Sequence, residues 1–304
     1  MLDRLAARVV GRRRELEAVV AALAARRNLL LEGPPGTGKS TVLRAVAAEA
    51  GLGFEFVEGN AELTPARLVG SFDPSAVLTE GYVPEVFVDG PLVTALREGS
   101  ILYLEELNRV PEETLNVLIT VMSEGEIHVP RLGRVAAHRE FRLVAAMNPF
   151  DAVGTARIAS AVYDRCCRLA MDYQGAAEET AIVTAVLDRA PTGPGQLPES
   201  QLDASVAMVR DSRSHPDLRS GSSVRGAIDH AMLCIELAGL RGVDPSDDTV
   251  TLDAAHLALS GRLRIREGCT RSPEDIVEEL WAAHFGPRPD GGGDTDGGDG
   301  AGKA

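Results

Sequence analysis

Short apolar runs alternate with helix-like patterns through the first half of the chain. The apolar runs have the length of strands and lie at residues 28–31, 54–57, 100–104, 141–147 and 167–171. Apolar positions recur with helical spacing at residues 12–25, 39–50, 91–98 and 111–124. Strands that alternate with helices usually form a parallel sheet that helices cover. The pattern therefore predicts an α/β domain over residues 1–174.

The pattern becomes helical after residue 175. Helical periodicity predicts helices at residues 176–189, 200–210, 222–240, 252–266 and 273–284. We therefore expect a small all-helical domain over residues 175–285. The final segment, residues 286–304, is dominated by glycine and aspartate and cannot bury enough apolar surface to fold, so we expect a disordered tail there.

Composition narrows the classes of function. The formal net charge of −14 disfavours a broad binding surface for nucleic acid or for an anionic membrane. The first residues lack the apolar run of a secretion signal, and nowhere do 18 consecutive apolar residues occur. We therefore expect a cytoplasmic protein that binds neither nucleic acid nor membrane.

The clearest motif is GPPGTGKS, residues 33–40, which follows one predicted strand and opens a predicted helix. It matches the phosphate-binding pattern GxxxxGK[ST] in the required strand–loop–helix context. Glycines let backbone N–H groups approach phosphates, the lysine reaches the outer phosphates, and the hydroxyl binds Mg²⁺. The predicted ligands of ATP are Gly33, Pro34, Pro35, Gly36, Thr37, Gly38, Lys39, Ser40 and Thr41.

A second motif, ILYLEELNR at residues 101–109, joins a buried strand to two adjacent carboxylates. A phosphate loop needs a carboxylate at the end of a neighbouring strand to hold Mg²⁺, and hydrolysis needs another group to orient the attacking water. We assign Glu105 to the metal and Glu106 to the water. The same pair could instead begin the next helix, where acidic residues suit the helix dipole.

The series GPPGTGKS, EELNR, FRLVAAMNP, AVYDR and GSSVRGAI resembles the motifs of an AAA+ ATPase of the MoxR family, over residues 9 to about 270. The resemblance implies a P-loop AAA+ core followed by a helical lid domain. In that family the strand end usually reads Asp-Glu, so Glu105 is longer by one methylene.

The resemblance implies roles for three more residues. Asn148 corresponds to the first sensor, which bonds the γ-phosphate and the attacking water, although Asn-Pro is also common in turns. Arg165 corresponds to the arginine finger that a neighbouring subunit inserts, with Arg157 and Arg168 as competitors and a structural salt bridge with Asp164 as the alternative. Arg225 corresponds to the second sensor, which reaches the nucleotide within its own chain.

Weaker signals surround this core. Val10 and Gly11 resemble the segment that packs on adenine with its backbone. Asn60 either holds Glu106 away from the water or forms a turn. Residues 61–90 and 126–141 resemble the inserted loop and the β-hairpin of this ATPase branch, which project from the ring and are expected to move a partner.

The leading hypothesis is a ring-forming ATP hydrolase, a hexamer, that remodels or activates a protein partner. The family implies a chaperone for the maturation of an enzyme complex, working with a separate von Willebrand factor A domain protein. One alternative is a nucleic-acid motor or loader, which the acidic charge disfavours. Another is a nucleotide-sensing scaffold with little turnover, which the unusual Glu105 makes conceivable.

Overall fold

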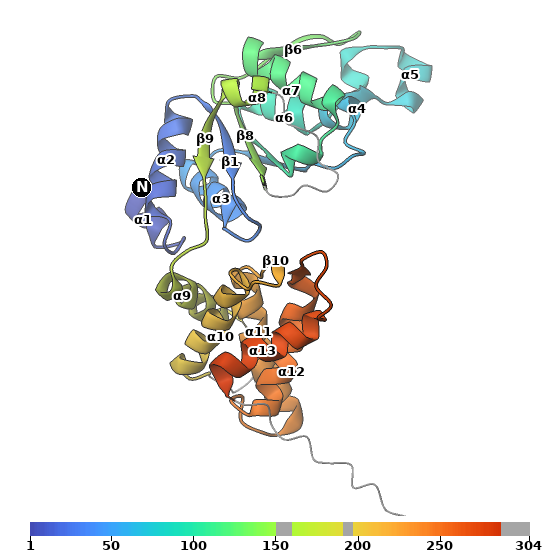
Figure 1. Cartoon of the computed structure of the whole chain (residues 1–304). Helices are drawn as coiled ribbons and strands as arrows, with labels where there is room; N and C mark the ends of the chain where they lie inside the picture. The colour runs from blue at the N-terminus through green and yellow to red at the C-terminus, as the bar shows by residue number, and fades with distance from the viewer. Residues whose placement is uncertain (150–159, 191–196, 287–304) are drawn as a thin grey trace, which may run out of the picture. The chain divides into compact units, whose positions relative to one another are not determined.

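The computed structural model describes residues 1–149, 160–190 and 197–286, which form two compact units that divide after Gln174 (Figure 1). Apart from Gly286, the predicted tail lies outside the described residues, as does Arg157. Within the described ranges, no helix is both long enough and apolar enough to cross a bilayer.

The first unit is built on a parallel sheet of five strands in the order β2–β5–β8–β1–β9. The strands are β1 (Asn28–Glu32), β2 (Phe54–Glu58), β5 (Ile101–Glu105), β8 (Arg142–Met147) and β9 (Cys166–Ala170). Strand β8 therefore lies between β5 and β1. The predicted parallel α/β sheet is confirmed.

Helices cover both faces of this sheet (Figure 1). They are α1 (Leu2–Ala6), α2 (Arg13–Ala24), α3 (Lys39–Ala50), α6 (Pro91–Glu98), α7 (Glu112–Glu124) and α8 (Ser160–Arg165). Gly51 caps the end of α3 and Gly125 caps the end of α7, both in the left-handed conformation that glycine adopts without steric cost.

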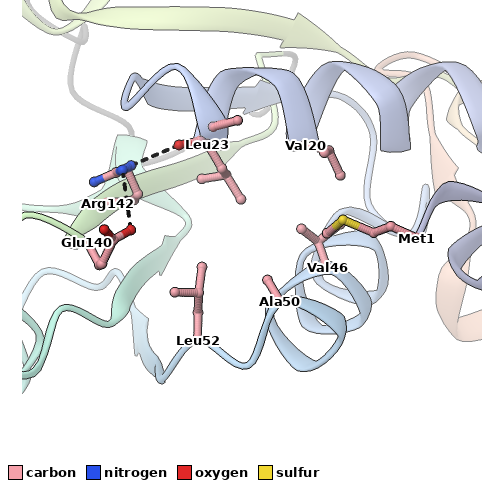
Figure 2. Close-up of a pocket in the computed structure, with 9 residues that line it drawn as sticks. Met1, Val20, Leu23, Val46, Ala50, Leu52, Glu140 and Arg142 are labelled. Atoms are coloured by element: carbon pink, nitrogen blue, oxygen red, sulfur yellow. Dashed lines mark hydrogen bonds and ion pairs between the residues drawn. The ribbon is translucent and has the colours of Figure 1, made fainter.

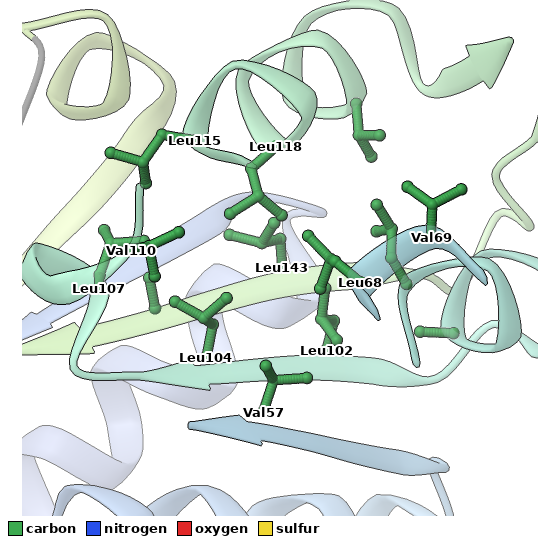
Figure 3. Close-up of a cluster of buried hydrophobic side chains, with 14 of the residues drawn as sticks. Val57, Leu68, Val69, Leu102, Leu104, Leu107, Val110, Leu115, Leu118 and Leu143 are labelled. Carbon is green, nitrogen blue, oxygen red and sulfur yellow. The ribbon is translucent and has the colours of Figure 1, made fainter. Parts of the chain in front are cut away.

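Side chains of β5 contribute alternately to two hydrophobic cores, one on each face of the sheet, because successive side chains of a strand point to opposite faces. Leu102 and Leu104 pack with α6 and α7 in one cluster (Figure 3). Ile101 and Tyr103 pack with α2 and α3 in the other. The side chain of Glu105 should therefore lie on the face that carries α3, where the phosphate loop begins its helix.

The two predicted inserts fold as separate projections that touch. The first contains α4 (Pro65–Val69), α5 (Pro74–Glu80), the 3₁₀ turn η1 (Pro84–Val86) and a hairpin of β3 (Gly70–Phe72) with β4 (Phe87–Asp89). The second is a hairpin of β6 (Glu126–Val129) with β7 (Gly133–Ala136). The Arg131 guanidinium lies 3.5 Å from the ring centroid of Tyr82, so a cation–π contact joins the two inserts.

The second unit is mainly helical, as predicted. Its helices are α9 (Ala176–Leu187), α10 (Glu199–Ser212), α11 (Val224–Arg241), α12 (Asp248–Leu259) and α13 (Pro273–Phe285). The expectation of an all-helical domain misses a small antiparallel pair, β10 (Leu218–Ser220) with β11 (Arg264–Ile265).

The helix predicted at 252–266 was too long. Helix α12 ends at Leu259, and a 3₁₀ turn, η3 (Ser260–Arg262), follows it. Leu263 is buried and extended, and the next apolar residue, Ile265, comes two positions later in β11. That spacing suits a strand, because alternate strand residues share a face.

A buried arginine fixes the edge of the sheet at which β8 begins. Arg142 is 6% exposed, and its guanidinium donates to three carbonyl oxygens: Leu23 at 3.1 Å, Arg139 at 2.8 Å and Phe141 at 2.5 Å. The first bond ties β8 to the last turn of α2, beside a pocket lined mainly by aliphatic side chains (Figure 2). Burial lowers the pKa of Arg142, but arginine begins so far above neutrality that it stays charged.

We expect Arg142→Met to destabilise the first unit by about 3 kcal/mol, because it leaves three carbonyl groups without their charged donor. Trp281, the only tryptophan, lies in the second unit, so its fluorescence follows that unit during urea unfolding. The unfolding transition followed by circular dichroism should begin at a lower urea concentration. The midpoint of the transition followed by fluorescence should not change. The exposed Arg139 is the matched control: Arg139→Met should shift neither. An unchanged circular dichroism curve for Arg142→Met would contradict this role.

Candidate functional site

The segment Gly33–Thr41 forms a loop between β1 and α3 and continues into that helix. Gly36 and Gly38 have φ values of +77° and +85°, which side-chain-bearing residues rarely adopt. Gly33 is required for space, because a Cβ there would lie 2.0 Å from the carbonyl oxygen of Met171. The loop can therefore turn its backbone N–H groups toward a phosphate chain.

Lys39 is held inside this loop. Its side-chain amine donates to the carbonyl oxygens of Gly33, at 2.7 Å, and Pro34, at 2.9 Å. The residue is 7% exposed, so its positive charge is concentrated within the loop. Phosphate oxygens are stronger acceptors than neutral carbonyls for such a charged donor, so a bound phosphate could replace them.

Ser40 and Glu105, the predicted metal-binding pair, lie in contact on one face of the sheet. Ser40 Oγ, in the first turn of α3, donates to Glu105 Oε1 at 3.1 Å and lies 3.2 Å from Tyr103 Oη. Burial raises the pKa of Tyr103, so its hydroxyl keeps its proton. Two side chains on one face of β5 therefore converge on the serine that ends the phosphate-loop motif. These oxygen ligands are of the type that a hard divalent cation takes.

Glu106 follows the end of β5 at a turn of the backbone. Its φ and ψ of 55° and 41° are left-handed, an uncommon conformation for a residue other than glycine. Its Oε2 lies 3.0 Å from Arg109 Nε. Gly59, after β2, packs tightly against this turn: its N–H donates to the Glu105 carbonyl at 2.8 Å, and a Cβ would lie 2.5 Å from the Glu106 carbonyl oxygen.

Asn148 follows Met147, the last residue of β8, and is half-buried. Because β8 separates β1 from β5, Asn148 lies at the strand end between the phosphate loop and Glu105. The structure therefore brings this residue to the same edge of the sheet as the other candidates. Its role as a sensor stays a prediction.

Asn60 forms a local turn beside the site. Its Oδ1 accepts from the Glu62 N–H at 2.9 Å, and its Nδ2 donates to the Glu58 carbonyl at 3.3 Å. The side chain is exposed. These bonds favour the turn over a restraint on Glu106.

Arg165 lies at the other edge of the sheet from its own phosphate loop. It ends α8 and directly precedes β9, which pairs in parallel with β1 from Asn28↔Cys166 to Glu32↔Ala170. A five-residue strand spans about 15 Å. The Arg165 side chain donates to Ser123 Oγ at 2.6 Å and to the Ala161 carbonyl at 3.0 Å. Its competitor Arg168 donates to Glu32 Oε2 at 2.5 Å.

The segment predicted to pack on adenine is fastened to the loop by residues that the motifs did not identify. Arg12 is 4% exposed and donates to the carbonyl oxygens of Thr37, at 2.8 Å, and Asp172, at 2.5 Å. Gln174 Nε2 donates to the Val10 carbonyl at 2.6 Å. Gly11, between Val10 and Arg12, has a left-handed φ of +66°.

Arg225 lies in the second unit, in the first turn of α11, and its side chain is exposed. Arg225 and the phosphate loop belong to different units, so the contact of Arg225 with nucleotide stays a prediction.

Comparison with known proteins identifies ATPase relatives. Residues 28–166 match the family described as AAA domain, dynein-related subfamily. The gas vesicle ATPase GvpN2 of Halobacterium salinarum is 29% identical over 268 residues, which cover 83% of this chain and 73% of the relative. The gas vesicle ATPase GvpN of Ancylobacter aquaticus is 30% identical over 252 residues, covering 77% and 67%.

Solved structures share the fold. The Thermotoga maritima RuvB Holliday junction branch migration motor superposes with a TM-score of 0.55 at 17% identity, over 82% of this chain and 70% of that one. NtrX from Brucella abortus gives 0.53 at 22% identity, over 77% and 50%. At such identities the likeness concerns the fold alone. From the sequence relatives, the chain is an ATPase and belongs to the family of AAA proteins that contains the GvpN gas vesicle ATPases.

Proposed function

We propose that the chain is a ring-forming, Mg²⁺-dependent ATP hydrolase of the MoxR type that remodels a protein partner. The observation that carries the proposal is the 3.1 Å contact between Ser40 and Glu105, beside a loop that encloses Lys39. Two oxygen ligands at that separation fit a magnesium ion, which when bound would neutralise charge on the phosphates.

Each residue then has one task. The loop backbone and Lys39 hold the phosphates, while Ser40 and Glu105 hold the metal. Glu106 orients the attacking water, and Asn148 bonds the water and the γ-phosphate. Arg165 is too far along the sheet to serve its own loop, which supports its action on the neighbouring subunit of a hexamer. Arg225 would reach the nucleotide from the second unit.

A protein partner is supported by exposed apolar side chains on the first insert. Leu78 is 88% exposed, Tyr82 52% and Val88 59%. The relatives are named gas vesicle ATPases, so we propose that the partner is a protein of such an assembly, with a von Willebrand factor A domain protein as the adaptor. The net charge of −14 favours a protein over nucleic acid, and we place the reaction in the cytoplasm.

Lys39→Ala should abolish binding of ATP, whereas Glu106→Gln should keep binding and lower the rate of hydrolysis by about 10²-fold or more. The difference arises because only Lys39 contacts phosphate in the ground state. Titration with a fluorescent ATP analogue and a phosphate-release assay measure the two effects. Equal loss of binding in both variants would contradict the assignment of Glu106 to the water.

The Glu106→Gln variant should also retain its partner, because ATP stays bound and the cycle stops before hydrolysis. We expect a protein to copurify with Glu106→Gln in the presence of ATP and Mg²⁺, and to be released when ADP replaces ATP. Lys39→Ala is the matched control and should retain little. Recovery of DNA or RNA in place of a protein would favour the motor hypothesis.

Arg165→Ala should lower hydrolysis by about 10³-fold or more, the usual contribution of an arginine finger. Mixing it with Lys39→Ala should restore hydrolysis, because one variant supplies an intact nucleotide site and the other an intact arginine. Ser123→Ala, which removes the bond to Arg165 but keeps the arginine, should stay active. Mixed rings that assemble and remain inactive would reject Arg165 as the residue acting in trans.

A further inference from the structure

Glu32 is a buried carboxylate at the end of β1, directly before the phosphate loop. Its side chain is 4% exposed. It accepts hydrogen bonds from Tyr163 Oη at 2.9 Å and from Arg168 Nε at 2.5 Å. A buried carboxylate destabilises the fold unless such donors compensate for its lost hydration. The hydrolysis site described above gives this cluster no task.

The two donors flank Arg165 in the chain. Tyr163 lies on α8, two residues before Arg165, and Arg168 lies on β9, three residues after it. Both side chains reach the same carboxylate, so the position of Glu32 restrains the segment on each side of Arg165. This segment is the one that would present Arg165 to the neighbouring subunit.

The backbone of Glu32 leads directly into the nucleotide site. Its carbonyl accepts from the Met171 N–H at 2.7 Å, and the next residue, Gly33, packs against the Met171 carbonyl. The Gly33 carbonyl accepts from Lys39 at 2.7 Å. If Lys39 turns to a phosphate, Gly33 loses a charged donor, one residue away from Glu32.

We infer that Glu32 is a positioning residue that couples nucleotide binding in its own subunit to the placement of the Arg165 segment. The inference deepens the proposed function and rests on its trans-acting arginine. A purely structural tie between α8 and the sheet would hold this segment equally well with and without nucleotide. The two interpretations therefore differ in how the segment responds to ATP.

Tyr163→Phe is the sharpest change, because it removes one hydroxyl and keeps the ring. Burial and the Glu32 carboxylate raise the pKa of Tyr163 to about 12, so the hydroxyl remains a donor at neutral pH. Glu32→Gln tests the carboxylate at constant side-chain length. Glu17→Gln, on α2, makes the same change at an exposed carboxylate elsewhere in the same unit and is the matched control.

The first experiment measures amide hydrogen exchange of residues 160–168 in the full chain, with and without Mg²⁺ and a non-hydrolysable ATP analogue. The wild type and Glu17→Gln should show a change in exchange on adding nucleotide. Tyr163→Phe and Glu32→Gln should lose this change while still binding the analogue. A response equal to that of the wild type in both cluster variants would overturn the inference.

The second experiment uses mixed rings in which Arg165→Ala is the hydrolysing subunit. The neighbouring subunit supplies Arg165 to this site. That neighbour is either Glu106→Gln, which binds ATP, or Lys39→Ala, which holds no nucleotide. Coupling predicts rates that differ about fivefold or more between the two donors. Adding Tyr163→Phe to each donor should remove this difference, and its persistence would overturn the inference. If neither donor restores hydrolysis, the trans role of Arg165 fails, and the exchange experiment still decides whether Glu32 couples the loop to α8.

Discussion

The parallel pairing of β8 with β1 on one side and β5 on the other is the constraint on which the site depends. The register runs from Leu29↔Val144 to Glu32↔Met147 on one side and through Leu104↔Ala145 on the other. Parallel strands end at one edge, so the loop after β1, Asn148 after β8 and the carboxylates at the end of β5 must lie together. The spacing between neighbouring strands is about 4.8 Å, which brings groups two strands apart within reach of long side chains.

Two adjacent glutamates can serve different chemistry because the backbone changes conformation between them. Glu105 is the last residue of a strand and keeps the face of Tyr103, where α3 supplies Ser40. Glu106 adopts a left-handed conformation, a local strain of about 1–3 kcal/mol, and turns toward Arg109. Gly59 leaves room for that turn. The strain is consistent with a functional requirement on where the second carboxylate points.

Local patterns predicted most of this arrangement, and long-range contacts account for what they missed. The helix of residues 39–50 and the strands beside it follow from periodicity and from the phosphate-loop motif. The contacts of Tyr103 with Ser40, of Gln174 with Val10 and of Arg168 with Glu32 join residues 63, 164 and 136 positions apart. No short stretch of sequence contains both members of such a pair. Sequence patterns therefore cannot distinguish Arg168 or Gln174 from the other arginines and glutamines of the chain. Among the residues of these three contacts, only Tyr103 could have been noticed in the sequence, because its hydroxyl lies within an aliphatic strand two residues before Glu105.

The sheet that brings the residues of the phosphate site together also places Arg165 at the opposite ends of the strands. Strand β9 runs parallel to β1, so the residue before β9 lies at the edge opposite the loop. A chain built in this way carries its phosphate loop at one edge and a candidate arginine at the other, and completing a site with Arg165 requires a second copy. Glu32 accepts hydrogen bonds from Tyr163 and Arg168, which lie on either side of that arginine in the chain, and it adjoins the loop, so the two edges are joined through one buried carboxylate. If Arg165 acts on a neighbouring subunit as proposed, a change at the end of β1 reaches the residues that hold its segment.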